Sequence, residues 1–114
     1  MVAHQEAALD AVFGALGDPT RRRILMRLRN GAEVSASALA APFPMSLPGV
    51  TKHLRSLQRA QLVDQRKRGR ERLYRLRPEP LRIANQWLVE YESFWTARLD
   101  SLNEYVRRDL HHDA

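Results

Sequence analysis

The 114-residue chain contains no cysteine and no long apolar run. Without cysteine the protein can form neither a disulfide bond nor a thiolate metal site, and it has no thiol nucleophile. No apolar run approaches the roughly 20 residues that a helix needs to cross a bilayer. The first residues also lack the basic start and the apolar centre of a secretory signal. We therefore expect a cytoplasmic protein with no membrane partner.

Sequence signatures of enzymes are also missing. The chain has no glycine-rich loop that could hold a phosphate and no cluster of metal ligands at a characteristic spacing. The prediction is that the protein is not an enzyme and carries no cofactor and no metal ion. Its length is typical of one domain, and a second independent core is not expected.

The net charge of +6 is concentrated in one stretch of the chain. Residues 46–77 contain ten basic residues and two acidic ones, whereas the remaining 82 residues contain nine basic and eleven acidic ones. Clustering of this kind is typical of a surface that binds a polyanion. A solvated arginine-rich face is the alternative interpretation.

Two helices are predicted at the start of the chain. Apolar residues recur at helical spacing up to Gly17, which predicts a first helix over about residues 1–17. Asp18 is a good N-cap for a second helix, and Pro19 suits its first position because the missing N–H has no partner there in any case. The second helix is expected to end at Gly31, which is a common C-terminal signal.

A helix-turn-helix is predicted over residues 35–60. Ser35 is a candidate N-cap for a short third helix, and Ser46 is one for a fourth helix over about residues 47–60. Two helices joined by a tight turn, of which the second is basic, are typical of this motif. A helical wheel assigns a buried stripe of the fourth helix to Leu47, Val50, Leu54 and Leu57.

A β-hairpin, which we call the wing, is predicted over residues 62–77, with Gly69 supplying a positive φ at its tip. A final helix over about residues 79–110 would be about 45 Å long at 1.5 Å per residue, which is longer than so small a core can cover. This order of elements predicts a mainly α protein with a small β-hairpin. The fold class is a winged helix-turn-helix with additional helices at both ends.

The outward face of the fourth helix mixes small, polar and basic residues. Lys52 and Arg55 have the reach to donate to guanine edges or to phosphates, and the free N–H groups at the helix start can bind a phosphate. An ordinary surface helix is the alternative, and His53 could instead lie at the margin of the core. The predicted DNA contacts of this helix are Ser46, Pro48, Gly49, Thr51, Lys52, His53 and Arg55.

Basic residues also crowd the tip of the wing. Their mutual repulsion does not stabilise the free protein. A cluster of this kind is explained if the tip contacts phosphates or a minor groove of DNA. Glu71 is the expected local ion-pair partner. The predicted DNA contacts of the wing are Arg66, Lys67, Arg68, Gly69, Arg70 and Arg72.

Helix and wing together predict a regulator that binds double-stranded DNA in a sequence-specific way. The alternative is a winged-helix module that makes protein–protein or RNA contacts without operator specificity.

The final helix carries an apolar stripe that includes Leu88, Trp95, Leu99 and Leu102. A long helix cannot hide such a stripe on its own domain, so we predict that it pairs with a second copy of the chain about a two-fold axis. The aromatic residues between 87 and 95 have two open interpretations. They could pack in the interface between copies, or they could line a small-molecule pocket there.

Several segments resemble the ArsR-type winged-helix repressors. The most specific similarity is residues 46–54, Ser-Leu-Pro-Gly-Val-Thr-Lys-His-Leu, and weaker similarities cover 18–25, 39–40, 57, 60–63, 68–70 and 74–76. The resemblance implies a homodimer that binds an operator near its own promoter and represses until an effector binds. It also implies that the first and last helices form the dimer interface. The corresponding residues are Leu9, Val12, Phe13, Leu88, Tyr91, Trp95, Leu99 and Leu102.

The metal sites of that family are not reproduced. In its metal-sensing members a Glu-Leu-Cys-Val-Cys-Asp-Leu segment supplies thiolates, but the aligned residues 33–39 have serine at both cysteine positions and alanine in place of aspartate. Other members bind zinc-like ions through Asp and His of the last helix. Here His111 and His112 stand at its end, where a solvated tail is the better interpretation. The chain resembles the metal-independent branch, and its effector, if one exists, is unknown.

Overall fold

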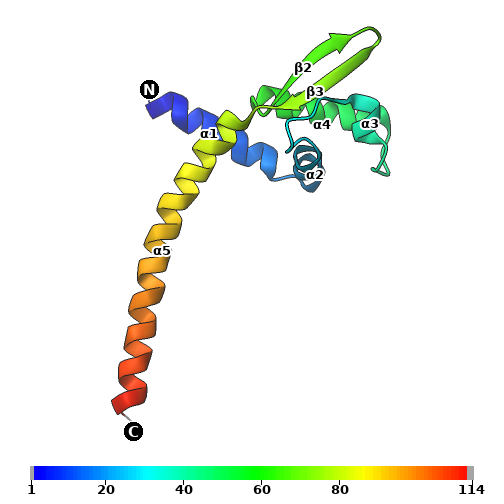
Figure 1. Ribbon diagram of the computed structural model, residues 1–114. Helices are drawn as coiled ribbons and strands as arrows, with labels where there is room; N and C mark the ends of the chain where they lie inside the picture. The colour runs from blue at the N-terminus through cyan, green and yellow to red at the C-terminus, as the bar shows by residue number, and fades with distance from the viewer. Residues whose placement is uncertain (1, 113–114) are drawn as a thin grey trace. The chain divides into compact units, whose positions relative to one another are not determined.

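The computed structural model describes residues 2–112, and within them the side chains of residues 6–110 (Figure 1). The chain divides into two compact units, residues 1–84 and residues 85–114. The elements are α1 (Val2–Leu16), α2 (Pro19–Arg27), β1 (Val34–Ser35), α3 (Ala36–Ala40), α4 (Leu47–Arg59), β2 (Val63–Arg68), β3 (Glu71–Leu76) and α5 (Pro78–His112). The predicted fold class, mainly α with a small β-hairpin, is confirmed, and β1 adds a third strand to the hairpin.

Three helices of the first unit begin at the predicted N-caps. The side chains of Asp18, Ser35 and Ser46 each accept a hydrogen bond from a backbone N–H two or three residues further along, at distances from 2.8 to 3.3 Å. Each bond satisfies a donor that has no partner within the helix. Local side-chain chemistry therefore sets where α2, α3 and α4 begin.

Two arginines of α2 close the C-terminal end of α1. Arg21 donates from Nε to the carbonyl of Ala15 at 2.7 Å and from Nη2 to that of Gly14 at 3.1 Å. Arg22 donates from Nη1 to the carbonyl of Leu16 at 2.6 Å. The guanidinium groups bind carbonyls of the last turn of α1, of which that of Gly14 also accepts the N–H of Gly17 at 3.3 Å. Their charge suits the negative end of the helix dipole. These two arginines thus have structural partners.

The sheet has three antiparallel strands in the order β1-β3-β2. Strands β2 and β3 pair along their whole length and form the wing, and Gly69 at its tip has a φ of 62°, as predicted. Strand β1 was not predicted. It places Val34 opposite Tyr74 and Ser35 opposite Leu73, and two residues are too short to show a strand periodicity.

The core of the first unit is built by its helices and the base of the wing. Leu47, which was predicted in the buried stripe of α4, is 45% exposed, because the first residue of the helix precedes the turn that meets the core. Val12 is 1% exposed within this core and offers no surface to a partner, so we remove it from the predicted dimer interface. The largest fully buried side chains are Val12, Ile24, Leu28, Leu39, Val50, Leu54, Leu57, Leu62 and Val63.

Helix α4 ends with a residue in the left-handed region. Gln61 has a φ of 62°, its N–H donates to the carbonyl of Gln58 at 3.0 Å, and the N–H of Leu62 donates to that of Leu57 at 2.9 Å. This is the Schellman pattern, in which glycine is the preferred residue because a Cβ is strained there.

We expect Gln61→Gly to have a free energy of unfolding about 1 kcal/mol above that of Gln61→Ala, since both lose the Gln61 side chain but only alanine keeps the strained Cβ. Urea denaturation of the two variants measures the difference. Equal midpoints would show that the backbone at Gln61 is not strained.

The second unit consists of the remainder of α5. Among the described residues no helix is both long and apolar enough to span a membrane. One face of α5 carries exposed apolar side chains.

Candidate DNA-binding surface

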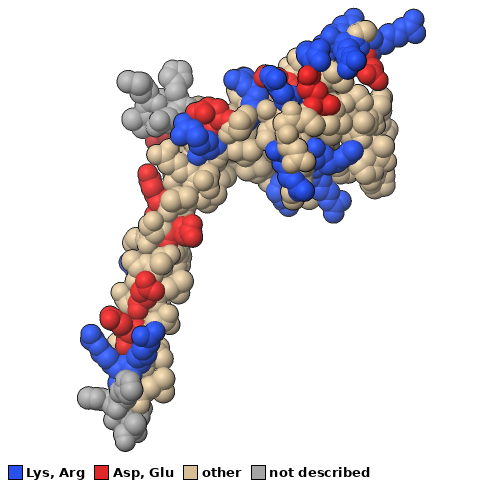
Figure 2. Space-filling view, viewed as in Figure 1, with Lys and Arg blue, Asp and Glu red and all other residues tan. Residues whose placement is uncertain are grey.

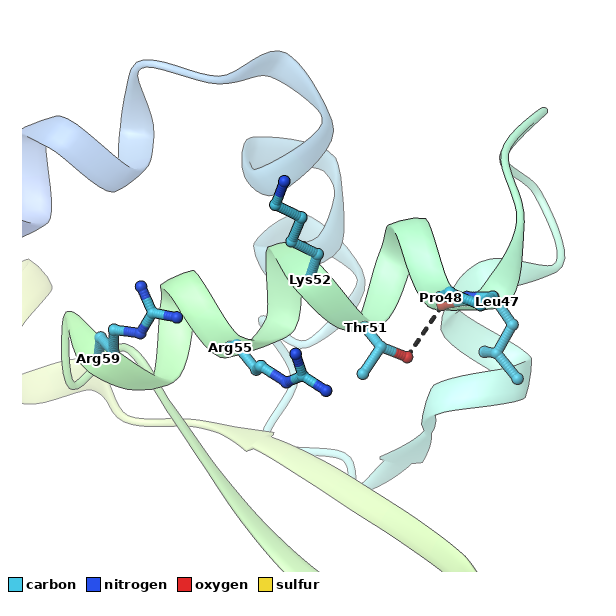
Figure 3. Close-up of a pocket in the computed structure, with 6 residues that line it drawn as sticks. All are labelled: Leu47, Pro48, Thr51, Lys52, Arg55 and Arg59. Carbon is cyan, nitrogen blue, oxygen red and sulfur yellow. Dashed lines mark hydrogen bonds between the residues drawn. The ribbon is translucent and has the colours of Figure 1, made fainter.

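A hollow of about 530 Å³ lies along the outer face of α4 (Figure 3). Most of its lining residues are three or four positions apart, so they share one face of the helix. Arg59 was not among the predicted contacts, although its position one turn after Arg55 could have indicated it. The lining residues are Leu47, Pro48, Thr51, Lys52, Arg55 and Arg59.

The cationic groups of this hollow are available to an external anion. Within the described part of the chain, the side chains of Lys52, Arg55 and Arg59 make no hydrogen bond and no ion pair. Arg55 extends back along the helix toward Thr51 in Figure 3. The hydroxyl of Thr51 donates to the carbonyl of Leu47 at 2.9 Å, which fixes its rotamer. The hollow therefore offers three unpaired charges beside one ordered side chain.

The other predicted residues of the helix do not line the hollow. Ser46 and Gly49 form the first turn, where the hydroxyl of Ser46 accepts the N–H of Gly49 at 3.3 Å. His53 is half-buried, and its Nδ1 lies 4.0 Å from a carboxylate oxygen of Asp18. The backbone N–H of Arg21 and the nearby His53 lower the pKa of Asp18. This geometry matches the alternative interpretation of His53, at the margin of the core.

The wing tip is a second cationic surface. Lys67, Arg68, Gly69 and Arg70 are all exposed, and Figure 2 shows basic side chains gathered over the end of the β2–β3 hairpin. In the described residues these three cations have no hydrogen-bond or ion-pair partner. An unpaired charge cluster on an exposed hairpin suits contact with a phosphate backbone.

Two of the predicted wing residues instead have partners within the protein. Arg66 binds Glu33 through both Nε and Nη2, the latter at 3.1 Å from Oε1. The hydrogen bond from Arg66 lowers the pKa of Glu33. Arg72 donates from Nη1 to Oε1 of Gln65 at 2.9 Å. The carboxylate that pairs with Arg66 is thus Glu33 rather than the expected Glu71.

A further basic region lies over α2 (Figure 2). The count of charge along the chain did not reveal it, because acidic residues elsewhere offset its arginines. Arg27 donates from Nη1 to the carbonyls of Ala38 at 2.7 Å and Leu39 at 3.2 Å, which ties α2 to α3. A hollow of about 630 Å³ beside it is lined by Pro19, Arg22, Arg23, Met26, Arg27, Pro42 and Phe43.

An exposed apolar stripe runs along α5. At 100° per residue its members fall within about 80° of one another. Trp87 and Tyr91 stack with ring centroids 5.5 Å apart, and Arg98 lies 4.8 Å from the ring centroid of Phe94. The stripe is about half exposed along its length, and it comprises Leu88, Tyr91, Trp95, Leu99, Leu102 and Val106.

Candidate metal ligands do not gather in the described part of the chain. No group of three or more His, Cys, Asp or Glu side chains there could hold a metal ion. The side chains of His111 and His112 lie outside the described ones.

Residues 16–66 match a family model described as a helix-turn-helix domain. The chain is 38% identical over 97 residues to the HTH-type transcriptional regulator Rv2034 of Mycobacterium tuberculosis, covering 85% of this chain and 87% of that protein. The crystal structure of the ArsR family transcriptional regulator RHA00566 is similar with a TM-score of 0.73 and 37% identity, over 80% of this chain and 93% of that one. The chain belongs to the ArsR family.

Two further relatives extend this ArsR-family comparison. The transcriptional repressor SdpR of Bacillus subtilis is 31% identical over 83 residues, covering 73% of this chain and 91% of that protein. The homodimeric winged helix-turn-helix domain of Mb0332 from Mycobacterium bovis is similar with a TM-score of 0.59 and 26% identity, over 82% of this chain and 84% of that one.

Family membership confirms the predicted resemblance and the predicted class of function. The protein is an ArsR-family transcriptional regulator with a helix-turn-helix of the DNA-binding type, and it is not an enzyme. The individual DNA contacts remain predictions.

Proposed function

We propose that this ArsR-family protein is a cytoplasmic homodimeric repressor that binds a palindromic operator. The observation that carries the proposal is the unpaired cationic lining of the α4 hollow, together with the unpaired cations of the wing tip. A helix face with Thr51, Lys52 and Arg55 suits contact with base edges in a major groove, and an exposed basic hairpin suits the adjacent backbone. The name of SdpR supports repression as the mode of action.

The apolar stripe of α5 supports the homodimer. Its side chains, such as Trp95 at 50% and Leu99 at 54% exposure, form a contiguous apolar face of the kind that marks a protein interface. Leu9 and Phe13 of α1 complete the proposed interface, and the homodimeric state of the Mb0332 domain supports it. A two-fold dimer places its recognition helices about 34 Å apart on a palindromic site, one turn of DNA.

Selection of bound duplexes from a random pool tests this function. We expect enrichment of one palindromic sequence, with affinity about a thousandfold or more above that for random duplexes at physiological salt. Its affinity should fall steeply with salt, because each phosphate contact releases counterions. Equal and weak binding to every duplex would favour the alternative, a winged-helix module for protein or RNA contacts.

A further inference from the structure

The wing leaves the core partway along its length. Tyr74 of β3 is 3% exposed and belongs to the core, and Gln65 lies opposite it on β2. Leu73, one residue nearer the tip and on the opposite face of β3, is 7% exposed. Beyond it, residues 66–72 are all exposed. No apolar packing therefore holds the part of the hairpin that carries Lys67, Arg68 and Arg70. A two-stranded ribbon in water is only marginally ordered by its own hydrogen bonds.

A chain of side-chain hydrogen bonds begins where this packing ends. Arg72 of β3 donates from Nη1 to Oε1 of Gln65 at 2.9 Å, and Nε2 of Gln65 donates to Oε1 of Gln58 at 3.0 Å. Gln58 belongs to α4, and both glutamines are half-buried. Because side chains alternate along a strand, Gln65 and Arg72 share the sheet face of Tyr74. The three residues connect both strands of the wing to α4.

Arg66 attaches the opposite face of β2 to the rest of the protein. Arg66 follows Gln65 in β2, so its side chain points away from that face, and there it binds both carboxylate oxygens of Glu33. Strand β2 is thus attached on both faces at the last residues before the free tip. The attachments use Arg66 and Arg72, two of the residues that were predicted to contact DNA, and they leave Lys67, Arg68 and Arg70 at the tip available.

We propose that Gln58 and Gln65 are positioning residues for DNA binding. This inference rests on the proposed function. These two residues fix the direction in which the wing leaves α4. They thereby present Lys67, Arg68 and Arg70 to the phosphate backbone of DNA while α4 lies in the major groove. Ordering the hairpin before it meets DNA reduces the conformational entropy that binding would otherwise cost.

The expected result is that Gln65→Ala and Gln58→Ala each lower the affinity for duplex DNA about three- to tenfold, the effect of one net hydrogen bond. The double variant should bind no worse than Gln65→Ala alone, because Gln65→Ala already breaks the hydrogen bond to Gln58. Fluorescence anisotropy titrations of a labelled 30-base-pair duplex at fixed salt measure these affinities. A random sequence suffices, since the tip contacts are expected to carry no sequence information.

Coupling to the tip separates positioning from a general effect on folding. In a protein that already carries Arg68→Ala and Arg70→Ala, the further change Gln65→Ala should lower affinity by less than about twofold, since the contacts that it positions are gone. The matched control is Gln61→Ala. It removes a different glutamine hydrogen bond at the base of the wing, the one that Nη1 of Arg77 donates to Oε1 of Gln61 at 2.6 Å. It should keep the affinity of the unaltered protein within about twofold.

The outcomes distinguish this inference from the function on which it rests. If the unaltered protein binds no duplex, the proposed function fails and the inference with it. If it binds, but Gln65→Ala and Gln58→Ala keep full affinity, the positioning role alone is overturned. It is equally overturned if Gln65→Ala causes the same loss with and without the tip arginines.

Discussion

A protein with glutamate in place of both Trp95 and Leu99 is expected to be a monomer and to lose at least about a hundredfold in affinity for its palindromic site. Both side chains lie at the centre of the exposed α5 stripe, and each is about half exposed in the single chain. Buried in a two-fold interface, two carboxylates per chain would face two from the partner copy. Charges desolvated without a partner are strongly destabilising, so the dimer would not form.

The loss of DNA affinity follows from the loss of the second half-site. In a dimer the second recognition helix binds at a high effective concentration once the first has bound, whereas a monomer forgoes this advantage. Sedimentation velocity over a range of concentrations measures the mass, and anisotropy titration of the selected palindrome measures the affinity. A monomer should still bind DNA weakly, because its own wing and α4 are unchanged.

The matched control places the same two charges on the other side of the same helix. Ser93→Glu with Ala97→Glu adds glutamates about 160° from Trp95 on the helical wheel, at exposed positions. This variant should stay a dimer and bind the palindrome as before. A dimeric mass for Trp95→Glu with Leu99→Glu would contradict the proposed interface, and so would a monomeric control.

The elements that could be predicted are those specified by neighbouring residues. The caps Asp18, Ser35 and Ser46 act on backbone groups two or three residues away, and Gly69 acts within its own turn. Such signals are read directly from the chain. The apolar stripe of α5 was predictable for a related reason, since a helical period shows which side chains share a face.

What was missed depends on contacts between distant residues. The partner of Arg66 is Glu33, 33 positions away, and only the pairing of β1 with β3 brings these segments together. Helical periodicity alone assigned Leu47 to the core, and the family resemblance alone placed Val12 in the dimer interface. The folded chain reverses both, because burial depends on where a helix meets its neighbours.

The roles of the basic side chains at the candidate site also depend on contacts that form only in the folded chain. A count of charge along the chain located the basic surface but could not separate its arginines by role. In the folded chain Arg66 binds Glu33 and Arg72 binds Gln65, whereas Arg68 and Arg70 have no such partner among the described residues. Gln58 and Gln65 carry no charge, and no sequence pattern singles them out as a pair.

Arg55→Ala is expected to weaken binding to the selected operator by about tenfold to a hundredfold and binding to random duplexes much less, if Arg55 donates to a base edge. Its guanidinium lines the α4 hollow and has no partner among the described residues. A hydrogen bond to a base exists only on the matching sequence, whereas a contact with phosphate exists on every sequence. The ratio of the two affinities is therefore the informative quantity.

The paired change Arg68→Ala with Arg70→Ala should behave differently. These exposed tip residues are expected to meet phosphates, so both affinities should fall by similar factors. The slope of log affinity against log salt should also become shallower by about 3 to 4 for a dimer that loses four phosphate contacts. Arg29→Ala is the control, since it removes one exposed charge outside the α4 hollow and the wing.

Titrations of operator and random duplexes at four salt concentrations decide between the two roles. Arg55→Ala should lose specificity and keep nearly the salt dependence of the unaltered protein. The tip variant should keep specificity and show a shallower slope of log affinity against log salt. Equal losses on both duplexes for Arg55→Ala would make Arg55 a phosphate contact and transfer base reading to other residues of α4, with Thr51 and Lys52 next to be tested. An unchanged salt dependence of the tip variant would mean that the wing does not contact the phosphate backbone of DNA.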